Sequence, residues 1–339
     1  MKKGNKAIKI IRYFLLLLVI AVGLVSIIGT GGGGDGGGGG GGGGTAAVYP
    51  RFAYVANSDD DSVSFYAVEY DTGRLRYQGK IDAGDRPYCV TVDPSGSYAY
   101  VANFASHTVS QYTIGADGAL TAMTPAAVDA GASPISVTVD PSGSYTYVAN
   151  AWGDTVSQYT IGADGALTAM TTAMVGAGDG PGSVTVDPSG SYAYVTNLRS
   201  CNVSQYTIGT DGALSAMTPA TVRAGDVPIS VTVDPSGSYA YVANRAGDNV
   251  SQYTIGTDGT LTPVSPSTIA ARQEPTSIVL TSGTVPVAAV PEYAYVANAN
   301  NFNVSQYTIG ADGALTAMTT PTVGAGSGPY FVVTTGHFE

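Results

Sequence analysis

Apolar and polar residues alternate one by one along much of the chain, in short runs that are separated by turn residues. In one such run Ile135, Val137 and Val139 alternate with Ser136 and Thr138. A period of two in β-branched and aromatic residues is typical of strands, and no stretch of these runs keeps the period of a helix. The pattern therefore predicts an all-β fold.

One strand recurs almost unchanged in six places, and each copy ends in asparagine. The steps between these asparagines are 46, 47, 47, 47 and 54 residues. A repeat of this length that is built from short strands is typical of the blades of a β-propeller. Six copies predict about six blades, and seven are possible. The six segments are Phe52–Asn57, Tyr98–Asn103, Tyr145–Asn150, Tyr192–Asn197, Tyr239–Asn244 and Tyr293–Asn298.

Each repeat divides into four strands, as the third copy shows. Between its first and second strands stands Asp140-Pro141-Ser142-Gly143, which has the residue order of a type I turn. Between its third and fourth strands stands Asp164-Gly165, a dipeptide of tight hairpins. The expected strands are 135–140, 145–150, 155–161 and 167–175.

The first copy lacks its own first strand, because residues 45–51 have neither the alternation nor the Asp-Pro turn. Near the other end of the chain, Tyr330–Thr334 follows a linker like those before the other first strands. We expect this segment to join the first blade and to close the ring, since closure removes two open sheet edges.

The tyrosines of the repeated strand have two possible roles. Tyr98 and Tyr100 lie on the same face of their strand, with Ala99 and Val101 on the other face. Large residues on one blade that pack against small ones on the next would fill the space between blades, and we expect this role. Stacking against sugars or bases is the alternative. The asparagine at the end of the strand, such as Asn103, is expected to cap the following loop.

The Tyr-Val-Ala-Asn strand, together with the preceding Ser-Val-Thr-Val-Asp-Pro-Ser-Gly segment, resembles the YVTN family of β-propeller repeats. It is also similar to the lactonase-like propellers, whose relatives hydrolyse sugar lactones or cyclise muconates. The resemblance covers residues 52–334 and implies the propeller fold, usually with seven blades. No catalytic motif of those relatives can be placed on this chain, so no site residue is carried over.

Residues 1–30 are predicted to be a signal peptide or a membrane anchor. They combine Lys2, Lys3, Lys6, Lys9 and Arg12 with an apolar run from 14 to 28, and both interpretations remain open. Residues 31–51 form a glycine-rich linker, and residues 52–339 form the propeller. The protein is therefore expected to be exported to the periplasm or the cell surface, with membrane contact only through residues 8–28.

The charge balance excludes one class of partner. The formal net charge is −11, and after Arg12 it is −16, from 25 acidic and 9 basic residues. Such a domain repels phosphate backbones, so nucleic acid is not an expected partner. Cys89 and Cys201 are the only cysteines and are expected to stay free. No motif points to a metal or a cofactor, and a monomeric propeller is expected.

The two ends of the propeller differ in how much the copies vary. The turn between the first and second strands and the turn between the third and fourth strands are nearly the same in every copy. The loop between the second and third strands and the connection between successive repeats vary widely. We call the second set the variable face. Side chains on such loops carry function in many folds, although drift of permissive loops explains variation equally well. The candidate binding residues are Arg86, His107, Trp152, Arg199, Arg223, Arg245 and Arg272.

Two functions fit these observations. The first is an exported interaction module that binds a protein, an anionic polymer or an anionic small molecule through the arginines of the variable face. The second is a lactonase-like hydrolase at the mouth of the central channel. It would need an acid or base and an oxyanion stabiliser from His107 and Arg86, or from the later arginines with Asp226 or Glu274. The sequence favours the first, because near-identical copies argue against an asymmetric pocket.

Overall fold

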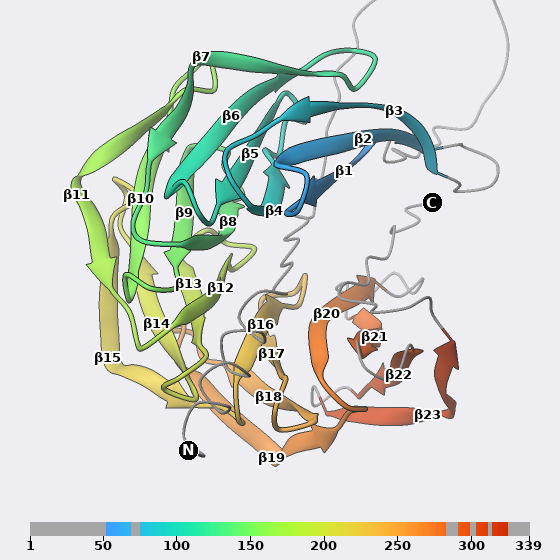
Figure 1. Ribbon diagram of the computed structural model, residues 1–339. Helices are drawn as coiled ribbons and strands as arrows, with labels where there is room; N and C mark the ends of the chain where they lie inside the picture. The colour runs from blue at the N-terminus through green and yellow to red at the C-terminus, as the bar shows by residue number, and fades with distance from the viewer. Residues whose placement is uncertain (1–51, 69–74, 283–290, 299–302, 311–313, 325–339) are drawn as a thin grey trace, which may run out of the picture.

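The protein folds into antiparallel sheets that are arranged around a common axis, as a computed structural model shows (Figure 1). The structure describes residues 52–68, 75–282, 291–298, 303–310 and 314–324. These residues form six sheets and no helix, so the prediction of an all-β propeller is confirmed. The predicted leader, the glycine-rich linker and the closing strand Tyr330–Thr334 lie outside the described residues. No described segment is a helix long and apolar enough to cross a membrane.

Blade 1 has three strands in the described residues, and blades 2 to 6 have four each. Blade 1 consists of β1 (Phe52–Asn57), β2 (Ser62–Val68) and β3 (Leu75–Asp82). Blade 2 consists of β4 (Pro87–Val92), β5 (Tyr98–Asn103), β6 (Thr108–Ile114) and β7 (Leu120–Asp129). Blade 3 consists of β8 (Pro134–Val139), β9 (Tyr145–Asn150), β10 (Thr155–Ile161) and β11 (Leu167–Gly176).

The remaining blades repeat this plan. Blade 4 consists of β12 (Pro181–Val186), β13 (Tyr192–Asn197), β14 (Asn202–Ile208) and β15 (Leu214–Arg223). Blade 5 consists of β16 (Pro228–Val233), β17 (Tyr239–Asn244), β18 (Asn249–Ile255) and β19 (Leu261–Ala270). Blade 6 consists of β20 (Pro275–Ser282), β21 (Pro291–Asn298), β22 (Asn303–Ile309) and β23 (Leu315–Gly324). The predicted division of the repeat into four strands is thus confirmed, and the first strand of each of blades 2 to 6 begins at a proline.

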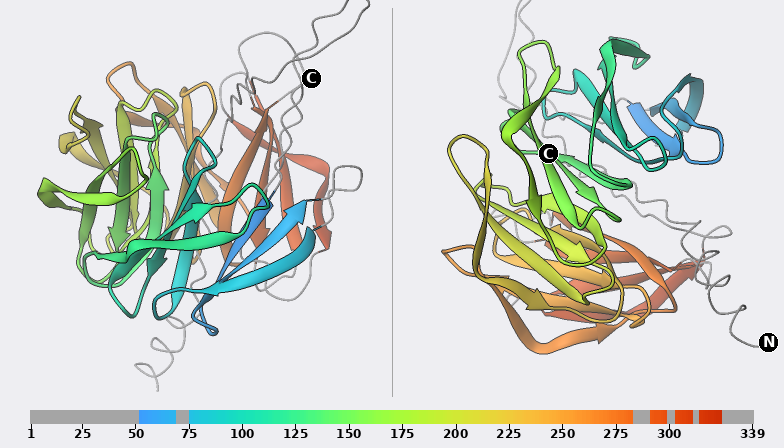
Figure 2. Two further views of the ribbon diagram at one scale, coloured as in Figure 1. Left: turned by 90° about the horizontal axis from the view of Figure 1, so that it is seen from above. Right: turned by 60° about the vertical axis from the view of Figure 1, so that its left-hand side comes forward.

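The first strands β4, β8, β12, β16 and β20 are innermost, and each contacts the next (Figure 1). The fourth strands lie on the outside, and the blades stand side by side in chain order in both views of Figure 2. Blade 1 lacks a first strand among the described residues, and its β1 contacts β4 directly.

A buried aspartate organises the turn between the first two strands of a blade. In blade 3 the Oδ1 atom of Asp140 accepts hydrogen bonds from the backbone amides of Ser144 and Tyr145, both at 2.8 Å. Its Oδ2 atom accepts hydrogen bonds from the amide and the hydroxyl of Ser142. Four hydrogen bonds to one carboxylate explain how an aspartate that is only 4% exposed is tolerated. The same arrangement recurs at Asp93, Asp187 and Asp234.

The tyrosines tie each blade to the next. Tyr147 of blade 3 is fully buried and donates a hydrogen bond to the carbonyl of Gly212 in blade 4, at 2.7 Å. Tyr159 donates a hydrogen bond back to the carbonyl of Asp129 in blade 2. Burial raises the pKa of Tyr147, and it raises the pKa of Tyr159 to about 12. The expected packing role of these tyrosines between blades is confirmed.

Neither Cys89 nor Cys201 forms a disulfide, as predicted. Cys89 is buried in β4, and its sulfur lies within hydrogen-bond distance of the backbone amide and carbonyl of Val137 on β8. At the equivalent position of blade 3, the hydroxyl of Ser136 accepts a hydrogen bond from Val184 of blade 4. Cys89 therefore replaces a serine in a contact between neighbouring inner strands.

Candidate functional site

The loops of the variable face share one backbone conformation. In blade 3 the amides of Ala151 and Trp152 donate to the carbonyls of Ser133 and Ala132, and the amide of Ala177 donates to the carbonyl of Asp154. Blades 2, 4 and 5 repeat these three backbone hydrogen bonds at the equivalent residues. The loops have therefore not drifted in shape. Their side chains differ while the backbone that presents them stays the same.

In blades 1, 2, 3 and 5 the side chain of the fourth loop residue bonds the connection that leads into the next blade. In blade 2 this residue is His107, whose backbone φ is +57° and whose Nδ1 atom accepts a hydrogen bond from the amide of Ser133. Asp61, Asp154 and Asp248 occupy the same position in their blades and accept the equivalent bond from Arg86, Gly180 and Glu274. His107 thus has a structural partner, and the side chain contributes to packing between blades.

An apolar cluster lies where the blades meet on the variable face. Its buried members come from five successive blades, blades 2 to 6, whereas four other clusters each join only two neighbouring blades. Contact between side chains of so many blades is possible only near the axis. Leu198 lies over Gly182, where an added Cβ atom would clash with its side chain. We call this group the axial cluster: Tyr88, Ile135, Ala151, Leu198 and Ile229.

A charged pair stands beside the axial cluster. Arg245 holds the loop position that Ala151 and Leu198 hold in blades 3 and 4, and Glu274 directly precedes β20. The terminal nitrogen of Arg245 lies 3.5 Å from the carboxylate of Glu274, and the two side chains are 16% and 29% exposed. The other ion pairs among the described residues are more exposed. The pair makes the mouth of the propeller asymmetric, which the near-identical repeats did not suggest.

Aromatic side chains extend from the axial cluster to the surface. The ring of Phe104 lies 5.0 Å from that of buried Tyr88 and 6.0 Å from that of Trp152, between ring centroids. The guanidinium of Arg86 lies 5.5 Å from the centre of the Phe104 ring, and it donates a hydrogen bond to the hydroxyl of Tyr88. Trp152 is 59% exposed. Arg86 and Trp152 were predicted from sequence, whereas Tyr88 and Phe104 were missed.

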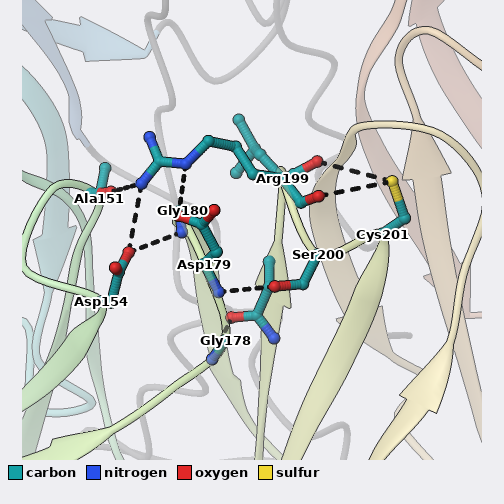
Figure 3. A network of polar contacts seen from close by, with 10 residues as sticks. Ala151, Asp154, Gly178, Asp179, Gly180, Arg199, Ser200 and Cys201 are labelled. Atoms are coloured by element: carbon teal, nitrogen blue, oxygen red, sulfur yellow. Dashed lines mark hydrogen bonds and ion pairs between the residues drawn. The ribbon is translucent and has the colours of Figure 1, made fainter.

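Arg199 is held by a polar network between blades 3 and 4 (Figure 3). Its Nε atom donates to Asp179, and one terminal nitrogen donates to Asp154 at 3.2 Å and to the carbonyl of Ala151 at 3.3 Å. The other terminal nitrogen points away from both carboxylates in Figure 3. The guanidinium is thereby fixed in place while part of its donor capacity faces solvent.

Arg223 and Arg272 lie apart from this group. Arg223 is exposed at the end of the outermost strand β15, and its carbonyl accepts a hydrogen bond from Tyr253. Arg272 is exposed in the connection between β19 and β20. Within the described residues neither side chain has a carboxylate within ion-pair distance. The structure therefore brings Arg86, Trp152 and Arg199 close to the axis and leaves these two arginines farther out.

The asparagine at the end of each second strand does not cap the loop as expected. The amide nitrogen of Asn103 donates to the hydroxyls of Thr108 and Ser110, which lie on the next strand β6. The asparagine therefore joins two neighbouring strands by side-chain bonds. In blades 4 and 5 the Oδ1 atom of Asn197 or Asn244 also accepts a hydrogen bond from the amide of Gly178 or Gly225 in the connection that precedes the blade. Within the described residues, no group of three acidic, histidine or cysteine side chains could hold a metal ion.

Blades that radiate from one axis define the chain as a β-propeller, and its variable loops gather at one end of that axis. The chain belongs to the family described as "Lactonase, 7-bladed beta-propeller", whose model matches residues 50–290. The resemblance inferred from the repeats is thus confirmed. The family description gives seven blades, and the described residues form six sheets.

Solved structures share the fold. A putative 6-phosphogluconolactonase from Bacteroides fragilis is 23% identical, with a TM-score of 0.71 over 83% of each chain. The periplasmic gluconolactonase of Pseudomonas aeruginosa is 20% identical, with a TM-score of 0.68 over 82% of this chain and 83% of that one. A comparison with curated proteins found no match. Likeness at these identities shows the fold, and the reaction must be argued from the site.

Proposed function

We propose that this protein opens sugar lactones by hydrolysis at the mouth of the propeller, with Arg245 and Glu274 as the reacting residues. The observation that carries the proposal is the partly buried Arg245–Glu274 pair beside the axial cluster. Membership of the lactonase family supports the same reaction class. The interaction module that the sequence favoured becomes the second candidate.

Lactone hydrolysis needs two functions that this pair can supply. Water adds to the lactone carbonyl while a base removes its proton, and the ring C–O bond then breaks to give a hydroxy acid. Glu274 can accept the proton from water and deliver it to the departing ring oxygen. Arg245 can stabilise the negative charge that develops on the carbonyl oxygen and then hold the carboxylate product.

The surroundings of the pair favour such a role. The neighbouring axial cluster is apolar and excludes water from one side of the two charges, which strengthens their electrostatic effect on a bound substrate. At 3.5 Å the pair is loose, so the guanidinium can turn toward a ligand without losing a short hydrogen bond. Glu274 is also positioned by its backbone, because its amide donates to Asp248 at 2.9 Å.

The test measures hydrolysis of glucono-δ-lactone by acid release, corrected for the spontaneous rate. We expect Glu274→Gln and Arg245→Ala each to lower kcat by about 100-fold or more, in line with the loss of a general base or of an oxyanion stabiliser. Arg223→Ala, which removes an exposed arginine far from the pair, is the control and should keep the wild-type rate. Wild-type protein with no rate above background, or a Glu274→Gln variant of full activity, would overturn the proposal.

A binding role for the outer arginines is the second candidate. Arg223 and Arg272 are exposed and have no ion-pair partner among the described residues, so both can meet an anionic polymer or protein. Such binding is expected to weaken with salt, because the charges are solvent-exposed and the chain is acidic overall. Replacing both by Ala should abolish retention on an anionic glycan column if this role is real, and unchanged retention would contradict it.

Export is part of the proposed function. It is supported by the basic and apolar pattern of residues 1–28, which is typical of a leader. The structural neighbour from Pseudomonas aeruginosa is described as periplasmic. Cell fractionation tests the proposal, and recovery of the full-length chain in the cytosol would contradict it.

A further inference from the structure

Blade 2 differs from the two blades that follow it at three positions beside the axis. Arg86 directly precedes its first strand, Tyr88 is the second residue of that strand, and Phe104 is the first residue after its second strand. Tyr88 belongs to the axial cluster, and Phe104 packs against that cluster. The corresponding residues of blades 3 and 4 are small or aliphatic: Ser133, Ile135 and Ala151, and Gly180, Gly182 and Leu198. Blade 2 therefore brings a positive charge and two aromatic rings to a place where these blades have neither.

The side chain of Arg86 is held in one orientation by the two aromatic residues. One terminal nitrogen of its guanidinium donates a hydrogen bond of 3.1 Å to the hydroxyl of Tyr88. The centre of the guanidinium lies 5.5 Å from the centre of the Phe104 ring and 5.8 Å from that of the Tyr88 ring, which is within the range of a cation–π contact. Arg86 is partly buried. The guanidinium is thus fixed in place without the help of a carboxylate.

Arg86 has no acidic partner among the described residues, since no carboxylate there lies within ion-pair distance of it. The other four arginines between residues 83 and 282 either pair with a carboxylate or are exposed: Arg199 and Arg245, and Arg223 and Arg272. Asp61 accepts a hydrogen bond from the backbone amide of Arg86, and the exposed Asp59 acts on Tyr88 through its charge alone. Arg86 therefore combines partial burial with a charge that no described residue neutralises.

The hydroxyl of Tyr88 has a proton to donate. Tyr147 and Tyr159 give theirs to backbone carbonyls, whereas the Tyr88 hydroxyl accepts from Arg86 and has no acceptor for its own proton within the described part of the chain. Burial raises the pKa of Tyr88, so the hydroxyl keeps this proton at neutral pH. Tyr88 is only 1% exposed, and a buried donor without an acceptor is uncommon. An anion on the guanidinium of Arg86 would supply that acceptor.

We propose that Arg86 and Tyr88 form a binding site for the carboxylate group of a small organic acid. The two coplanar oxygens of a carboxylate match the fork of a guanidinium, and one of them can also accept the Tyr88 proton. A single arginine balances the one negative charge of a carboxylate, whereas a phosphate monoester carries nearly two. Glu274 occupies in blade 6 the position that Arg86 occupies in blade 2, so this site lies on the same face as the Arg245–Glu274 pair but in a different blade. It does not depend on the lactone reaction.

The test has two arms, because the carboxylate can belong to a free acid or to a lactone that carries one. In the first arm the full chain is titrated by calorimetry with propionate, benzoate and gluconate, and with propionamide as the uncharged control. We expect saturable binding of at least one acid that weakens with salt, and no binding of propionamide. The second arm compares the KM of glucaro-1,4-lactone, which carries a carboxylate, with that of glucono-δ-lactone. A tenfold rise of this KM ratio in Arg86→Ala would show that the site takes the carboxylate of a substrate, and an unchanged ratio with lost acid binding would show that it takes a free acid.

Matched variants assign the binding to these two residues. Arg86→Ala should weaken the acid at least tenfold, and Arg86→Lys should also weaken it, because lysine keeps the charge but not the fork. Tyr88→Phe keeps the ring in the axial cluster and should weaken it about threefold or more. Arg272→Ala removes an exposed arginine and should keep the wild-type affinity. Glu274→Gln should bind the acid as wild type does, so this proposal and that of lactone hydrolysis fail separately. No saturable binding of any of the three acids, or equal affinity in a folded Arg86→Ala variant, would overturn the site.

Discussion

The two ends of the propeller use the same repeat in different ways. At the end formed by the Asp-Pro turns, side chains and backbone recur together, and Asp140 and its equivalents make the same hydrogen bonds in four blades. At the variable face only the backbone bonds recur, while the side chains change from Trp152 to Arg199 and from Leu198 to Arg245. The difference shows that a fixed loop backbone leaves the side chains free to carry function.

The largest expected effect is at the uniform end. Asp140→Ala removes the acceptor of four hydrogen bonds and leaves partly buried backbone amides without a partner, so it should lower the free energy of unfolding by about 3 kcal/mol. Chemical denaturation measures this change. The control is Asp164→Ala, which removes one exposed bond to the amide of Ala166 and should cost less than about 1 kcal/mol. If both variants lost the same free energy of unfolding, the Asp140 carboxylate would not stabilise the turn as described.

Alkaline pH should unfold the protein through the tyrosines between blades. Burial raises the pKa of Tyr159, Tyr206 and Tyr253 to about 12. The unfolded chain loses these protons near pH 10 while the folded chain keeps them, so stability is full below pH 10 and falls as the pH rises toward 12. The slope should be about 1.4 kcal/mol per pH unit for each tyrosine. Thermal melts between pH 8 and 12 test this.

The matched variant for the alkaline transition is Tyr159→Phe. It removes one titrating group together with its hydrogen bond to Asp129, so the protein should be less stable at pH 8 and should lose stability less steeply above pH 10. A stability profile that is flat up to pH 12 in wild type would show that the tyrosines do not carry this effect.

His107 provides a smaller test, and it concerns the variable face. His107→Ala removes the acceptor for the amide of Ser133 and should cost about 1 kcal/mol. His107→Asp should restore most of this, because aspartate makes the same bond at the equivalent positions 61, 154 and 248. Loss of lactone hydrolysis in a fully folded His107→Asp variant would instead make His107 part of the active site.

The smallest effect is expected at the outer arginines. Arg223→Ala and Arg272→Ala remove exposed side chains that have no ion pair among the described residues, so each should change the stability by less than about 0.5 kcal/mol. Equilibrium denaturation is the measurement. A loss above about 1 kcal/mol for either variant would show a structural contact that the present account lacks.

The fold could be predicted from sequence because its signals are local. The period-two strands, the turn around Asp140 and the spacing of the Tyr-Val-Asn strands each fall within one repeat. The closing strand Tyr330–Thr334 lies outside the described residues and stays a prediction.

The site was predictable only in part, because it depends on contacts between repeats. The loops that contain Arg86, Trp152, Arg199 and Arg245 stood out by their variation. The axial cluster did not, since Tyr88 and Leu198 come from different blades and meet only in three dimensions. Aligning the loops position by position would have shown one signal in advance, because His107 stands where other copies have aspartate.

We expect stability to depend on the uniform end and the proposed catalysis to depend on the variable face. The most direct test measures melting temperature and glucono-δ-lactone hydrolysis together in two variants, Asp140→Ala and Glu274→Gln. The account predicts that Asp140→Ala melts several degrees lower but keeps its hydrolysis rate well below its melting temperature. It predicts that Glu274→Gln melts near wild type and loses about 100-fold or more in rate. A Glu274→Gln variant that hydrolyses the lactone at the wild-type rate would contradict it.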